Sequence, residues 1–177
     1  MGTVKVTNIE PIADNGTVTL GGSGDTFTLA SGVKQQLLRP TFMALSNTNQ
    51  SIPNSTLTKL QFADEQWDTN SAYSTTDHRF TVPTGYAGKY FFKAHFLIQS
   101  GDDKEYYLYL YKNGSLVTYT LGKEVTGGGA GNAMASTSAT LDLIVGDYIE
   151  AYGYNGTGVA KNSYSGYNIF TGFRIGD

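Results

Sequence analysis

The stretch that decides the fold is Arg79-Phe-Thr-Val-Pro-Thr-Gly-Tyr-Ala-Gly-Lys-Tyr-Phe-Phe-Lys-Ala-His-Phe-Leu-Ile98. A short apolar run ends at Pro83, and Gly85 and Gly88 then supply residues that suit a turn. Beyond this turn the apolar residues alternate over a length that indicates one long strand. The side chains that share its core face are Tyr90, Phe92, Ala94, Phe96 and Ile98.

The opposite face of this strand is half apolar. It alternates Phe91 and Leu97 with Lys93 and His95. A sheet that faces only water does not need such a face, whereas a contact between subunits does. We therefore expect a β-sandwich that associates with copies of itself.

The composition of the chain favours an all-β protein. Its 177 residues suit one domain, or one domain with an appendage, and 13 Tyr, 9 Phe and 22 Gly accompany the absence of a long helical pattern. The net charge of -3 without basic runs argues against a nucleic-acid partner. No stretch approaches the roughly 20 apolar residues of a membrane span, so we expect no membrane insertion.

The chain contains no cysteine. Extracellular heads commonly gain stability from disulfides, so this absence indicates either assembly in a reducing cytoplasm or stabilisation by oligomerisation. A virion protein would satisfy both conditions.

Several segments resemble the jelly-roll heads of the complement C1q and tumour necrosis factor superfamily. They are the 79–98 stretch, Leu108-Tyr-Leu-Tyr-Lys-Asn-Gly114, Ser138-Ala-Thr-Leu-Asp-Leu-Ile-Val-Gly-Asp-Tyr-Ile-Glu150 and Phe170-Thr-Gly-Phe-Arg-Ile175. The resemblance extends from about Thr41 to Ile175, with the segments in the family's order and spacing. It implies a ten-stranded jelly-roll β-sandwich that forms a homotrimer, with residues 41–177 as the head domain.

Residues 1–40 differ from the rest of the chain. Thr17-Val-Thr-Leu20 and Thr26-Phe-Thr-Leu29 repeat one short strand pattern on either side of a glycine-rich segment. Two such strands are too few to form a core alone. The segment is either a flexible leader or a threefold β-stalk, and it is similar to stretches in bacteriophage tail fibres and appendages. We interpret it as an N-terminal stalk that attaches the head to other virion proteins.

The segment Glu105-Tyr-Tyr-Leu-Tyr-Leu-Tyr111 is apolar on both faces of a predicted strand. One face should fill the sandwich, and the other displays three tyrosines that would form a large aromatic patch on a monomer. We therefore predict that part of the trimer interface consists of Tyr107, Tyr109 and Tyr111.

No constellation of catalytic or metal-binding residues is evident. Three carboxylates surround Trp67, but alternate strand residues face opposite ways, so we interpret Asp64, Glu65 and Asp68 as a solvated turn. The two histidines, His78 and His95, lack spaced partners and are expected at the surface or at an interface. We predict no catalytic residue, no metal and no cofactor.

The predicted ligand-binding surface lies at the end of the head opposite the stalk. The resemblance implies that both ends of the head domain lie together at its base. Counting antiparallel strands back from the last one then places at the opposite end the turn before Asn168, the Gly146-Asp147 turn and the hairpin at Asn113-Gly114. Tyrosines suit contacts with sugars or proteins because they are amphipathic and cost little entropy to order. The predicted ligand-binding residues are Lys112, Asn113, Asp147, Tyr164 and Tyr167. A side groove between subunits is the alternative location.

The function that these patterns favour is structural. We expect a virion protein, the trimeric head of a phage tail fibre or spike, which is assembled in the host cytoplasm and binds a receptor or polysaccharide on the host surface. An extracellular adhesion or signalling head of the same fold is one alternative. A glycan-degrading enzyme is another, and it would need two carboxylates roughly 5 to 10 Å apart in a groove.

Overall fold

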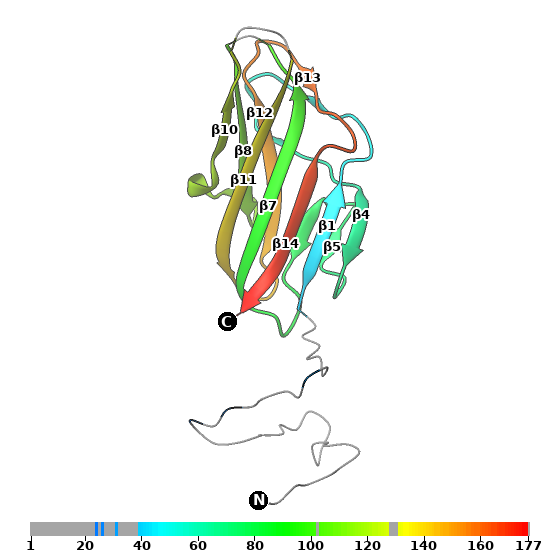
Figure 1. The fold of residues 1–177 in the computed structure, drawn as a ribbon, viewed down its shortest axis with the longest axis vertical. Helices are drawn as coiled ribbons and strands as arrows, with labels where there is room; N and C mark the ends of the chain where they lie inside the picture. Colours follow the sequence, from blue (N-terminus) through cyan, green and yellow to red (C-terminus); the bar gives the residue numbers. More distant parts are fainter. Residues whose placement is uncertain are drawn as a thin grey trace, which may run out of the picture. The chain divides into compact units, whose positions relative to one another are not determined.

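The computed structural model describes residues 24, 26, 31, 39–101, 103–127 and 131–176. Within these residues the protein is a β-sandwich with a single 3-10 helix, Thr118–Thr120 (Figure 1). The predicted stalk strands lie almost wholly outside the described residues. The stalk and its boundary at residue 40 therefore stay predictions.

The first sheet has five antiparallel strands in the order β11-β7-β14-β1-β4. Its longest pair joins β7 to β11 over their whole length. Buried and outward side chains alternate along β7, as the sequence predicted. The strands are β1 (Thr41–Leu45), β4 (Asp64–Asp68), β7 (Gly88–Gln99), β11 (Asn132–Leu143) and β14 (Ile169–Gly176).

The second sheet follows the order β10-β8-β12-β6-β5, with β3 paired to β12 and β9 paired to β8. Its strands are β3 (Thr58–Lys59), β5 (Tyr73–Ser74), β6 (Arg79–Thr81), β8 (Glu105–Lys112), β9 (Ser115–Leu116), β10 (Gly122–Val125) and β12 (Tyr148–Asn155). A separate ribbon pairs β2 (Ser51–Ile52) with β13 (Lys161–Asn162). The predicted jelly-roll sandwich is confirmed. The described part of the chain contains more than the ten predicted strands, because several strands of only two residues add to the number.

The core between the sheets is built around a cluster of aromatic rings. Phe42 lies at its centre, with ring centroids 4.8 Å from Tyr73, 5.2 Å from Phe80 and 4.9 Å from Phe170. All of these phenylalanines are fully buried. Burial of aromatic side chains is a main source of stability in a domain of this size, and it ties strands from both sheets together.

The two ends of the sandwich are distinct. The backbone N–H of Arg174, near the end of β14, donates to the carbonyl of Pro40, so the first strand begins and the last strand ends at the same end of the head, which we name the base. Antiparallel pairing also places the start of β7 and the end of β11 at the base. The opposite end, the apex, holds the end of β7 and the connection into β14 (Figure 1).

Candidate functional site

Three of the five predicted ligand-binding residues form one cluster at the base. The carboxylate of Asp147 pairs with Lys112 Nζ at 2.8 Å and accepts hydrogen bonds from Asn113 Nδ2 at 2.7 Å and the backbone N–H of Ile144 at 2.9 Å. Burial alone would raise the pKa of the Asp147 carboxyl, but these contacts outweigh burial and hold the pKa below its ordinary value. The carboxylate therefore joins two turns of the fold.

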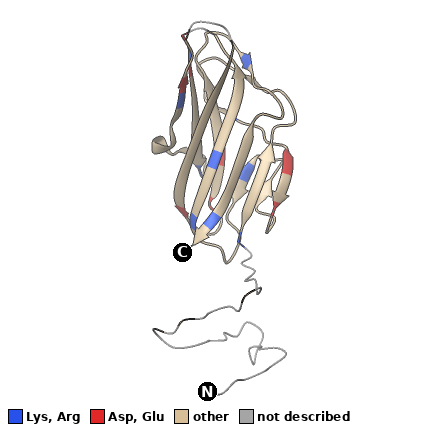
Figure 2. Cartoon of the chain, in the orientation of Figure 1, with Lys and Arg blue, Asp and Glu red and all other residues tan. Residues whose placement is uncertain are grey.

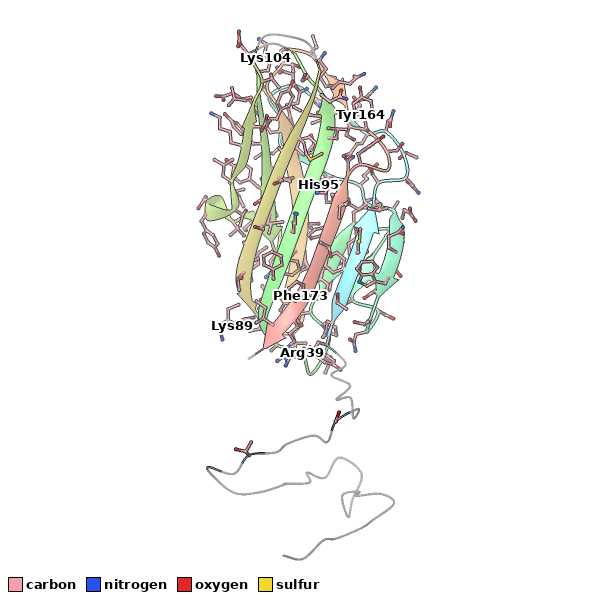
Figure 3. All side chains as sticks on the ribbon, viewed as in Figure 1. Arg39, Lys89, His95, Lys104, Tyr164 and Phe173 are labelled. Carbon is pink, nitrogen blue, oxygen red and sulfur yellow. The ribbon has the colours of Figure 1, made fainter. Side chains whose placement is uncertain are left out.

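The other two residues lie at the apex. Tyr164 donates its backbone N–H to the carbonyl of Leu97, near the end of β7, and Tyr167 is 61% exposed. Figure 3 shows Tyr164 near the apex and Arg39 and Lys89 near the base. The five predicted residues are thus divided between opposite ends of the head and do not form a single site.

The predicted placement of the Gly146-Asp147 turn and of the Asn113-Gly114 hairpin at the apex is wrong. One full-length strand, β12, separates the Gly146-Asp147 turn from the connection into β14. Connections on either side of one antiparallel strand lie at opposite ends of a sheet. The segment between them contributes only the two-residue strand β13, which pairs outside both main sheets.

The outward side of the first sheet carries an apolar surface. We name it the apolar face and define it by Met43, Trp67, Phe91, Leu97, Met134 and Phe173. The rings of Phe91 and Phe173 lie 5.4 Å apart, and Trp67, Met134 and Phe173 are each almost half exposed. The acidic residues of this sheet lie mainly on its edge strand β4, and the basic residues of β7 are Lys89 and Lys93 (Figure 2). The half-apolar surface predicted from the sequence is confirmed.

Two basic side chains interrupt the apolar face. Lys93 and His95 follow each other on the outward side of β7, opposite Thr171 and Ile169 of β14. Burial lowers the pKa of the His95 imidazole, and the nearby Lys93 lowers it further. His95 is thus held in its neutral form at neutral pH, in keeping with a half-buried position near the middle of the sheet (Figure 3).

The outward side of the second sheet carries a different surface. Tyr107, Tyr109 and Tyr111 project from β8 away from the core, as the alternation predicted. They meet two tyrosines of β12. The ring of Tyr107 stacks on Tyr154 at 4.9 Å, and the ring of Tyr111 stacks on Tyr152 at 3.9 Å. We name these five residues the tyrosine face.

A groove of about 320 Å³ opens on the tyrosine face. Its lining consists of Ser55, Leu57, Tyr107, Tyr109 and Tyr154. Sequence reasoning missed Tyr154 and the two loop residues. Alternation along residues 148–155 predicts that Tyr152 and Tyr154 point away from the core. That they lie beside the tyrosines of β8 follows only from the folded topology.

The carboxylates around Trp67 belong to an exposed edge strand. Their interpretation as a turn is wrong, because β4 pairs with β1 from Asp64 to Asp68. Asp68 Oδ2 accepts a 2.8 Å hydrogen bond from the backbone N–H of Tyr73. Among the described residues, no group of three or more histidine and acidic side chains is placed to hold a metal ion. No helix in the described part of the chain is long and apolar enough to cross a membrane.

Comparison with known proteins places this fold in a family. The family model of the C1q domain matches residues 41–175. The globular domain of the zebrafish complement 1qA protein superposes with a TM-score of 0.58 at 19% identity, covering 77% of this chain and 98% of that one. Murine APRIL at pH 5.0 gives 0.58 at 12% identity, covering 77% and 99% of the two chains.

The Eiger TNF structure from S. frugiperda gives a TM-score of 0.58 at 12% identity, covering 80% of this chain and 95% of that one. At these identities the structures establish the fold alone. A search of curated proteins found no match. The family model spans almost all of the described sandwich, from the first strand to the last. The chain therefore belongs to the C1q domain family.

Proposed function

We propose that this protein is the homotrimeric head of a virion appendage, such as a phage tail fibre or spike, and that it binds the host cell surface without catalysing a reaction. The observation that carries the proposal is the apolar face. Its aromatic and aliphatic side chains are unlike the usual surface of a monomer, and a second copy of the chain supplies a matching apolar partner.

The position of the apolar face suits a closed ring of three subunits. Phe173 and Phe91 lie toward its base end, whereas Leu97 and Met134 lie toward its apex end, so apolar contact extends along the sheet. Lys93 and His95 lie between these groups and contribute polar specificity to the contact. The family resemblance implies the same assembly. The predicted contact through Tyr107, Tyr109 and Tyr111 is the alternative. Loss of the trimer in Phe173→Asp supports the apolar face as the contact, and loss of the trimer in Tyr109→Ala supports the tyrosines.

Two further observations support the virion context. The chain has no cysteine, and oligomerisation supplies the stability that disulfides give to many small extracellular domains. The chain also enters and leaves the head at the base. An attachment made at the base leaves the apex and the tyrosine face free for a ligand.

The lining of the groove favours binding over hydrolysis. None of its described lining residues carries a carboxylate, and glycoside hydrolysis requires a pair of them across the substrate. The nearest acidic residue on the same strand, Glu105, pairs with Lys123 Nζ at 2.6 Å and accepts from the hydroxyl of Tyr107. Both of its oxygens are thus engaged.

An extracellular signalling or adhesion head is the second candidate. The similar solved structures favour it, because they include the globular domain of a complement protein and a TNF. Gene neighbourhood separates the two candidates. We expect capsid and tail genes beside this gene, and neighbours that encode secretion or cell-surface proteins would contradict the virion proposal.

Adsorption tests the binding role. Fluorescently labelled full-length protein is offered to a panel of bacterial strains, and bound label is measured before and after competition with unlabelled protein. We expect saturable, competed binding to some strains and none to strains that lack the relevant surface polysaccharide or receptor. The absence of saturable binding to every strain would contradict a head that binds a bacterial host.

A further inference from the structure

On the tyrosine face, the ring of Tyr109 makes an edge contact with Tyr107, with centroids 6.5 Å apart, but does not stack on the ring opposite it. Tyr109 of β8 lies directly opposite Tyr152 of β12 in the strand register. The Tyr152 ring instead leans along the sheet and stacks on Tyr111, with centroids 3.9 Å apart. On the other side, Tyr107 stacks on its direct partner Tyr154. The groove opens at Tyr109 and is bounded on the β12 side by the stacked pair Tyr107 and Tyr154.

A loop held in place by internal hydrogen bonds forms one wall of this groove. The wall residues are Ser55 and Leu57. The backbone N–H of Ser55 donates to the carbonyl of Asn155 at 2.7 Å. The side chain of Asn155 is fully buried, and its Nδ2 donates to the carbonyls of Ile52 at 3.0 Å and Val159 at 2.8 Å. The groove is thus preformed, which lowers the entropic cost of binding.

The chemistry of the groove combines aromatic faces with free hydroxyl groups. Within the described residues, no hydrogen bond engages the hydroxyls of Tyr109, Tyr154 or Ser55, so all three are available to a ligand. The groove has little net charge, because the Glu105 and Lys123 side chains at its apex end neutralise each other. Its volume of about 320 Å³ suits a small ligand.

A sugar ring is the neutral ligand that matches both parts of this lining. The C–H groups on one face of a pyranose carry partial positive charge and pack on the negative face of an aromatic ring. Its hydroxyls lie around the rim and exchange hydrogen bonds with phenol and serine hydroxyls. A charged peptide or nucleic acid would need paired charges that this lining does not offer.

We propose that the groove above Tyr109 is a binding site for a neutral pyranose of a glycan chain, with Tyr109 as its stacking platform and Ser55 and Tyr154 as hydrogen-bonding partners. This site specifies the ligand of the proposed host-binding head. It rests on the proposed function because the second sheet must stay exposed in the assembled trimer. It places glycan recognition on the side of the head, whereas the sequence predicted the apex.

The test uses saturation-transfer NMR on the full-length protein with four neutral disaccharides as probes: cellobiose, maltose, lactose and N,N′-diacetylchitobiose. Irradiation of the aromatic protons should transfer saturation to ring C–H protons of at least one probe. Tyr109→Ala should weaken that binding on the order of tenfold, because the stacking platform is removed. Tyr109→Phe retains the aromatic ring and removes only its hydroxyl, so its affinity for the disaccharide should fall less than that of Tyr109→Ala. Tyr119→Ala, which removes an exposed tyrosine of the 3-10 helix outside the groove lining, serves as the control and should bind normally. Loss of binding in Tyr167→Ala would instead locate the site at the predicted apex surface.

Each result has a definite meaning. Transfer that is lost in Tyr109→Ala and kept in Tyr119→Ala supports the proposal, provided that the mass by light scattering is unchanged. Transfer that survives Tyr109→Ala, or that is lost in Tyr119→Ala or in Tyr167→Ala, overturns it, as does the absence of transfer from all four probes. A change of oligomeric mass in Tyr109→Ala would instead identify the tyrosine face as a subunit contact and would also overturn it. Failure of glycan binding with an intact trimer leaves the proposed head assembly standing.

Discussion

Asn113 Nδ2 and Asp147 Oδ1 lie 2.7 Å apart at the base of the head, although 34 residues separate them in the sequence. The same asparagine accepts the backbone N–H of Tyr148 at 2.9 Å through its Oδ1. One amide thus links the hairpin after β8 to the turn before β12. This pair closes the base of the second sheet, whereas the sequence predicted that both residues form part of a ligand site at the apex.

We expect Asp147→Ala to destabilise the protein by about 2 kcal/mol, because it leaves Asn113 and the Ile144 N–H without their acceptor and removes the Lys112 ion pair. Urea unfolding measures this loss. Asp142→Asn, which changes an exposed carboxylate nearby, should cost much less. Equal stability of the two variants would show that the Asp147 contacts contribute nothing to folding.

The acid stability of the head should depend on the same carboxylate. The pKa of Asp147 in the folded protein lies below its ordinary value of 3.8. Its contribution to stability is therefore complete above the unfolded pKa and is lost as the pH falls through the lower, folded pKa. For the native chain, the urea concentration at the midpoint of unfolding, measured from pH 7 to pH 2, should decrease at the acid end of this series. For Asp147→Asn this decrease in the urea midpoint should be smaller. Identical pH profiles for the native chain and the variant would contradict a stabilising ionised Asp147.

The ion pair between Lys59 and Glu150 should stabilise the second sheet independently of the Asp147 contacts. Lys59 Nζ lies 2.9 Å from Oε1 of the buried Glu150 carboxylate. Lys59→Met should cost about 2 kcal/mol, because a buried carboxylate then lacks its charged partner. The double change Lys59→Met, Glu150→Gln should recover much of that loss. A double variant as unstable as the sum of the two single variants would show that the pair is not coupled.

Gly172 should tolerate no side chain. A Cβ at this position would lie 2.5 Å from a ring carbon of Phe92 and 2.9 Å from one of Phe42, within the aromatic core. Gly172→Ala should therefore lower stability by about 2 kcal/mol through overpacking. Gly127→Ala is the matched control, because no atom of the described residues, its chain neighbours aside, lies within 4 Å of its Cβ position. Thermal unfolding of the two variants distinguishes crowding from a general effect of glycine replacement.

Much of the fold could be predicted because strand alternation is a local property. The core face of β7 and the outward direction of Tyr107 and Tyr109 both follow from the period of two along each strand. The aromatic partners of these tyrosines could not be predicted in the same way. Tyr152 and Tyr154 lie more than 40 residues further along the chain, and their ring contacts depend on the register between β8 and β12.

The predicted position of Lys112, Asn113 and Asp147 was wrong for a different reason. Placing a turn at the base or the apex requires a count of full-length strands, and residues 156–168 contain turn residues and a two-residue strand in place of a full one. Miscounting this segment moved Lys112, Asn113 and Asp147 to the wrong end. Tyr164 and Tyr167 lie directly before the last strand, so their position at the apex did not depend on that count.

The oligomeric state of the full-length chain decides whether the apolar face is a subunit contact. Phe173→Asp places a carboxylate on that face beside Phe91, whereas Tyr119→Asp alters an exposed aromatic residue of the 3-10 helix, away from the face. Light scattering after size-exclusion chromatography gives the mass of the native chain and of both variants at micromolar concentration. We expect three times the 19.1 kDa chain mass for the native protein and for Tyr119→Asp, and a folded monomer for Phe173→Asp. A monomeric native protein, or a trimer that survives Phe173→Asp, would contradict the proposed assembly.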